Sequence, residues 1–171
     1  PTLVSGSIYT IAFNGTDAGG NSATEVSVTG ITYDTTAPAF SSLSPSTSST
    51  VNTTAVGYTL SKAIASGTVT YTRTGGTADG TVHTVNLAGT ELNSGTRSSA
   101  VLTNAPTLVS GSIYTIAFNG TDAGGNSATE VSVTGITYDT TAPTVTSVST
   151  TAHYWQLIAR QVDSDNFTDG T

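Results

Sequence analysis

The stretch PTLVSGSIYTIAFNGTDAGGNSATEVSVTGITYDTTAP occupies residues 1–38 and returns, letter for letter, at residues 106–143. The two copies lie 105 residues apart and diverge only where Ala39-Phe40 faces Thr144-Val145. A period of this length is too long for a solenoid repeat and matches one small domain. We therefore interpret the chain as part of a tandem array of near-identical domains, an organisation that favours reach, spacing or multivalency over chemistry.

The quoted stretch carries the strongest strand signals in the chain. Tyr114, Ile116 and Phe118 alternate with polar or small residues, which predicts a half-buried strand. Residues 131–138 alternate as well, but the inward parity slips by one at Gly135, where a β-bulge would restore it. Between these strands, a Gly-rich turn competes with the hairpin signal of Asn119-Gly120. We therefore expect Gly120 to mark a bulge instead of a turn.

Strand signals also recur at short spacing through the rest of the 105-residue period. They are residues 40–43, 56–60, 69–71, 85–87 and 100–102. With the two strands of the quoted stretch, they predict seven strands and an all-β, immunoglobulin-like (Greek-key) β-sandwich. The predicted core is Val56, Tyr58, Leu60, Val69, Tyr71, Val85, Leu87, Leu102, Tyr114, Ile116, Phe118, Val131, Val133 and Ile136.

A short motif ends each copy of the repeated stretch. Asp34-Thr-Thr-Ala-Pro38 recurs as Asp139-Thr-Thr-Ala-Pro143. Proline biases the residue before it to extended geometry, so this motif reads as a short, stiff connector. We expect residues 1–38 to be the last two strands of an Ig-like repeat and residues 39–143 to be a complete Ig-like repeat. Residues 144–171 would begin a third, divergent domain.

Composition narrows the function classes. The net charge is −7 and only 9 % of residues are charged, so no Lys/Arg face exists to neutralise the phosphates of a nucleic acid. The sequence contains no run of 18 apolar residues, which is the pattern that would predict a membrane-spanning helix. The chain has no cysteine and is rich in Thr and Ser. This combination favours a bacterial or archaeal surface protein over a disulfide-stapled eukaryotic module.

The residues from Tyr114 to Asn126 (YTIAFNGTDAGGN), the strand that follows them and Asp139-Thr-Thr-Ala-Pro143 together resemble the bacterial Ig-like repeats. Such repeats build the stalks of large surface adhesins and similar secreted proteins. The resemblance covers residues 1–143 and extends over residues 144–152. It implies seven-stranded sandwiches strung together outside the cell, with Tyr114 as the corner tyrosine. Beyond residue 152 the tail departs from the pattern, and it contains the only tryptophan, Trp155.

The same resemblance implies a metal site at the joint, because relatives place Ca²⁺ between domains. In such a sandwich the turn between the last two strands lies at the pole that receives the incoming connector. We therefore expect Asp34, Asp122 and Asn126 to lie close together, where their oxygens could bind Ca²⁺. The alternative is that Asp-Ala-Gly-Gly-Asn is a hairpin turn whose Asp and Asn serve turn geometry alone. No other cofactor is expected.

No catalytic constellation is visible. His83 and His153 lack metal-ligand spacing and are expected to be exposed strand histidines, and no Gly-x-Ser-x-Gly elbow or phosphate loop occurs. The only lysine, Lys62, could form an amide cross-link to an asparagine, but the sequence shows neither the apolar pocket nor the neighbouring carboxyl that this needs. We therefore predict that the chain is not an enzyme.

The leading hypothesis is a structural stalk or spacer repeat of a large extracellular, adhesin-like surface protein of a prokaryote. Its partners would be neighbouring repeats of the same chain or other copies of itself, with any glycan or host-surface ligand bound elsewhere in the full protein. A first alternative is a self-assembling extracellular filament in which partial domains, residues 1–38 and 144–171, exchange strands between copies. A second is a carbohydrate- or protein-binding Ig-like module that uses Tyr154 and Trp155.

Overall fold

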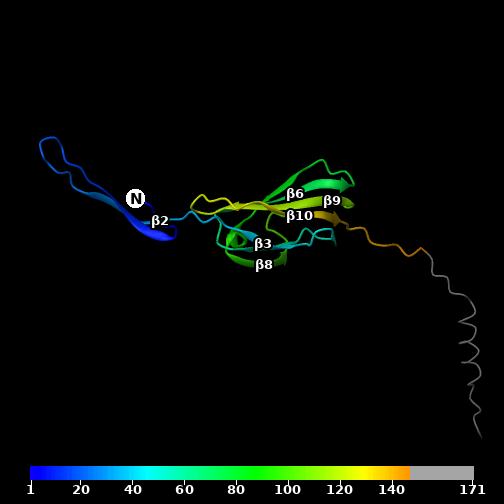
Figure 1. The fold of residues 1–171 in the computed structure, drawn as a ribbon. Coiled ribbons are helices and arrows are strands. Elements are labelled where there is room, and N and C mark those ends of the chain that lie inside the picture. The colour runs from blue at the N-terminus through cyan, green and yellow to red at the C-terminus, as the bar shows by residue number, and fades with distance from the viewer. Residues whose placement is uncertain (147–171) are drawn as a thin grey trace, which may run out of the picture. The chain divides into compact units, whose positions relative to one another are not determined.

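A computed structural model of the chain describes residues 1–146, and all of its strands lie within one unit, Pro1–Thr140 (Figure 1). Over these described residues the fold is all-β, as the sequence predicts, apart from one short 3-10 helix, Gly89–Leu92. Its strands are β1 Ser7–Phe13, β2 Val26–Tyr33, β3 Phe40–Ser44, β4 Thr50–Val51, β5 Val56–Leu60, β6 Ser66–Gly76, β7 His83–Asn86, β8 Gly95–Ala100, β9 Ser112–Thr121 and β10 Val131–Tyr138. Within residues 1–146, no helix has the length and apolar character that crossing a membrane requires.

The strands form three sheets. β1 and β2 pair as a two-stranded hairpin. From β3 to β10 the chain builds two sheets, one in the order β4-β10-β9-β6-β7 and one in the order β3-β5-β8. All pairings are antiparallel except that of β10 with β4. We refer to residues 39–140 as the two-sheet domain; Figure 1 shows β6, β9 and β10 in one layer and β3 and β8 in the other.

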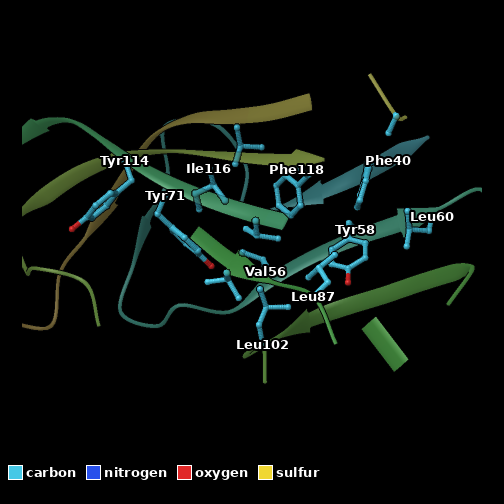
Figure 2. Packing of buried hydrophobic residues seen from close by; sticks show 14 of the residues in the cluster. Phe40, Val56, Tyr58, Leu60, Tyr71, Leu87, Leu102, Tyr114, Ile116 and Phe118 are labelled. Atoms are coloured by element: carbon cyan, nitrogen blue, oxygen red, sulfur yellow. The ribbon is translucent and has the colours of Figure 1, made fainter. Parts of the chain in front are cut away.

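A single hydrophobic core fills the space between the two sheets (Figure 2). The rings of Phe40, Tyr58 and Phe118 pack against one another within it, with centroids 5.5 to 6.1 Å apart. Every predicted core residue is buried except Val131, which is half-buried against the cluster. Phe40, Ile64 and Ala128 join the core without having been predicted.

Most predicted strands are confirmed, and two parts of the prediction are wrong. The strand expected at residues 100–102 is instead β8, which ends at Ala100. Its sequence, GTRSSA, offers no apolar alternation, and the apolar Val101-Leu102 pair that follows attracted the assignment. Gly120 lies inside β9, paired with Gly67, and marks no bulge. The bulge predicted at Gly135 is present, since the β9–β10 register shifts between Val133 and Ile136.

The two copies of the repeated stretch fold into the same hairpin. β1 pairs with β2 in the register Ser7↔Tyr33 and Ile11↔Val28, and β9 pairs with β10 in the register Ser112↔Tyr138 and Ile116↔Val133. These are the same pairings displaced by one 105-residue period, bulge included. The hairpin conformation is therefore encoded within the 38 residues, since the two copies have different surroundings.

Because the two copies have different surroundings, the same glycine-to-alanine substitution should affect stability in one copy and not in the other. A Cβ on Gly120 would lie 2.9 Å from Ile64 Cδ1 and 3.1 Å from the Ser66 carbonyl oxygen, whereas a Cβ on its counterpart Gly15 would meet nothing within 4 Å. We expect Gly120→Ala to lower the free energy of unfolding of the two-sheet domain by about 1–3 kcal/mol through overpacking. Gly15→Ala, the matched control, should leave it unchanged in urea unfolding. Equal effects would contradict the different environments of the two glycines.

Candidate functional site

The structure brings together the three residues that the sequence predicts at the joint. Asp122 and Asn126 lie in the turn that follows β9, and Asp34 directly follows β2. The Asn126 amide donates from Nδ2 to the backbone oxygen of Asp34 at 3.0 Å and to the Asp122 carboxylate at 3.1 Å. The incoming connector is therefore in contact with the β9–β10 turn, as predicted.

Part of this arrangement is ordinary turn geometry. The Asn126 N–H donates to Asp122 Oδ1 at 2.9 Å, and the Gly125 N–H donates to the Asp122 carbonyl at 3.1 Å. The same bonds recur in the first copy, where the Asn21 N–H donates to Asp17 Oδ1 at 2.8 Å. Asp and Asn thus shape the turn in both copies, and in the second copy the Asn also contacts the incoming connector.

The fourth member of the site, Lys62, was not predicted. Its ammonium, two residues beyond β5, donates to Asp122 Oδ2 at 2.7 Å, to the Thr36 carbonyl at 2.9 Å and to the Asp34 carboxylate. The Asp122 side chain is 2 % exposed, while those of Lys62 and Asp34 are 28 % and 25 % exposed. We call Asp34, Lys62, Asp122 and Asn126 the joint cluster.

The charges of the joint cluster hold one another in their ionised forms. Hydrogen bonds from Lys62 hold the pKa of both Asp122 and Asp34 below the usual range of a carboxyl. The hydrogen bonds to Asp122, and then to Asp34, raise the pKa of Lys62. A carboxyl whose pKa is depressed by folding stabilises the fold above its unfolded pKa of about 4, and this contribution is lost as the pH falls below that value.

The joint cluster resembles a cation-binding site in which the ammonium group of Lys62 takes the place of a metal ion. The Lys62 ammonium lies between two carboxylates and a backbone carbonyl, which are the ligand types that Ca²⁺ prefers. Within residues 1–146, no group of three or more His, Cys, Asp or Glu side chains is placed so that it could hold a metal ion. The Lys62 ammonium thus places a positive charge among the oxygens for which the sequence suggested calcium.

The pKa directions also bear on the amide cross-link from Lys62 to an asparagine. The carboxyl that this reaction needs is present, since Asp122 accepts a hydrogen bond from the Lys62 ammonium at 2.7 Å. Attack on the asparagine amide with loss of ammonia also requires the neutral amine, and the hydrogen bonds to Asp122 and Asp34 raise the pKa of Lys62, which disfavours that form at neutral pH. The site thus favours the charged pair.

A second polar cluster fixes the start of β9. The Tyr114 hydroxyl accepts a hydrogen bond from the Val109 N–H at 3.1 Å and donates to Asp79 Oδ2 at 2.6 Å. His83 Nε2 lies 2.8 Å from the same Asp79 oxygen, and its side chain is 17 % exposed. His83 is therefore not the exposed histidine that the sequence predicted. The hydrogen bonds from Tyr114 and then His83 lower the pKa of Asp79 to about 2.

The remaining sequence predictions fall outside the described residues. Tyr154, Trp155 and His153 all lie beyond residue 146, as does the body of the predicted third domain. No family model, curated protein or solved structure matches the chain.

Proposed function

We propose that the chain is a segment of a non-enzymatic stalk or spacer, built from Ig-like repeats, in a large extracellular surface protein of the adhesin type. The observation that carries the proposal is the 38-residue identity between two hairpins of the same register. Because the two copies are identical in every residue, the duplication adds a second element of the same length and shape. No residue is changed in a way that would give either copy a chemistry of its own.

The strand order supports an Ig-like assignment of the two-sheet domain. β3 and β4 follow one another but pair in different sheets, β3 with β5 and β4 with β10, as a first strand that switches sheets. Counted as one strand, they make seven. β10, β9 and β6 then correspond to strands G, F and C, and Tyr114 makes the tyrosine-corner bond from strand F to the backbone upstream. Fold likeness alone assigns no activity.

The contacts at the joint support a stiff spacer. The connector is held by the Lys62 ammonium at Asp34 and Thr36, by Asn126 at the Asp34 carbonyl, and by burial of Pro38. Ala39 then exchanges hydrogen bonds with Ser61 as β3 begins. A connector held at successive residues has few ways to bend, so the number of repeats would set the reach of the protein.

The spacer function predicts length in proportion to copy number. Head-to-tail arrays of residues 39–143 regenerate the joint sequence, because Asp139–Pro143 then precedes Ala39. We expect the maximum dimension in small-angle X-ray scattering to rise by about 40 Å with each added unit, from strands of about ten residues plus turns. Arrays of one, two and four units, measured at equal unit concentration, check this. A maximum dimension that levels off would mean that the repeats collapse on one another and would refute the spacer.

The two alternatives draw less support from the described residues. Strand exchange between residues 1–38 of one copy and 144–171 of another is favoured by the exposed apolar side chains of β1 and β2. However, residues 147–171, which would supply the other strands, lie outside the described part. The residues that favour a glycan- or protein-binding module, Tyr154 and Trp155, lie outside the described part.

A further inference from the structure

The hairpin β1–β2 exposes the face that its twin buries. Ile11, Phe13 and Val28 are 44 %, 62 % and 52 % exposed, whereas Ile116, Phe118 and Val133, their counterparts, are 3 %, 0 % and 6 % exposed. A hollow of about 460 Å³ lies on this hairpin, lined largely by apolar side chains that include Leu3, Tyr9 and Ile31. Contiguous apolar surface of this kind marks an interaction site.

The same hairpin also has an open edge. β9 pairs with β10 on one side and with β6 on the other, whereas β1 pairs, among the described residues, with β2 alone. An unpaired strand edge is a template for a further strand. The second copy shows which strand fits this template. β6 runs antiparallel to β9 and sets Val69 opposite Phe118 and Tyr71 opposite Ile116.

We propose that the β1–β2 hairpin is a docking surface for a sheet segment of the sequence type of residues 39–105, joined directly before Pro1. This segment would add a β6-like strand along β1, with its valine opposite Phe13 and its tyrosine opposite Ile11. Its counterpart of β3-β5-β8 would cover the apolar face as the second layer. The junction follows from the second copy, in which Ala105 runs directly into Pro106, the equivalent of Pro1.

A second copy of the present chain is a poorer occupant. Its own segment 39–105 is already closed by β9 and β10, which bury the core residues of that segment. The hairpin of another molecule could enter only by displacing an identical hairpin, which would then be exposed in turn. Covering the β1–β2 face therefore requires an additional acceptor segment. This inference rests on the repeat organisation in the proposed function but not on stiffness or extended shape.

Single cysteines provide the test, because the chain has none of its own. Val28→Cys and Val133→Cys are matched variants with identical neighbours in sequence and near-isosteric side chains. Each is made in the full chain and in a fusion that carries residues 39–105 before Pro1, and each is then alkylated with iodoacetamide. We expect Val28→Cys to react rapidly in the full chain and to slow by roughly tenfold or more in the fusion, toward the rate of Val133→Cys.

A control fusion carries Val69→Asp in the added segment only, which places a carboxylate in the new core and should leave Val28→Cys reactive. Rapid reaction of Val28→Cys in the unmodified fusion overturns the proposal, whether or not the added segment folds. The proposal is also overturned if alkylation of Val28→Cys in the unfused chain slows as the protein concentration rises. That result would mean that a second copy of the chain covers the hairpin. Because alkylation does not report molecular length, protection in the fusion stands even if the arrays fail to extend.

Discussion

Phe118→Ala should lower the free energy of unfolding of the two-sheet domain by about 3–5 kcal/mol, whereas Phe13→Ala should leave it nearly unchanged. The two phenylalanines occupy the same position in identical 38-residue sequences and the same register in their hairpins. They differ in their surroundings: Phe118 is fully buried against Phe40 and Tyr58, and Phe13 is 62 % exposed. Removing the Phe118 ring leaves a cavity in the core, whereas water fills the space left by the Phe13 ring.

Urea unfolding followed by circular dichroism measures this difference. An isolated two-stranded hairpin is only marginally stable in water, so the cooperative transition reports the two-sheet domain. Equal losses in the two variants would mean that the first hairpin is covered in solution by something that the chain itself supplies. A small loss at Phe118 would contradict the core as described.

The second large effect concerns the charge at the joint. Asp122→Asn should lower the thermal midpoint of the two-sheet domain by several degrees at pH 7, because Lys62 loses a buried, ionised partner at 2.7 Å. Asp17→Asn, its matched control, removes the same turn residue from the first copy, where the described partners of the carboxylate are the backbone and Asn21. That variant should leave the midpoint unchanged.

The pH dependence of the two variants has a definite sign. The pKa of Asp122 is held low in the folded state, so its contribution is present above pH of about 4 and is lost below it. The gap between the parent chain and Asp122→Asn should therefore be constant from pH 7 to about 5 and should narrow as the pH falls below 4. Thermal melts across this range measure the gap. A gap that widens in acid would show that Asp122 is not ionised in the fold.

The sequence predicts the fold well where side chains alternate. Tyr114, Ile116 and Phe118 have an apolar period of two, which places them on one face without further information. β8 fails this test, because its strand is held by pairing with β5 and not by an apolar face of its own. Ile64 joins the core from a loop, where no periodicity applies, and its side chain covers the two facing glycines, Gly67 and Gly120.

Three of the four members of the joint cluster were predictable from the sequence. Asp34, Asp122 and Asn126 follow from topology, because the β9–β10 turn and the incoming connector share a pole of the domain. Lys62 lies 60 residues from Asp122 in sequence, and a lone lysine near the end of a strand ordinarily indicates a solvated surface. The available signal was its uniqueness: it is the only lysine in a chain of net charge −7, and it follows a strand that ends at the same pole.

The most direct test of a stiff spacer is the distance distribution across one joint. Two units of residues 39–143 are joined, a spin label is placed on an introduced cysteine in each, and the distances are measured by pulsed electron resonance. We expect one narrow distribution that added calcium leaves unchanged, and a broad one when Lys62→Met removes the ammonium from the second unit. A broad distribution in the parent array would contradict the spacer, and one that narrows only with calcium would assign the joint to a metal ion instead of Lys62.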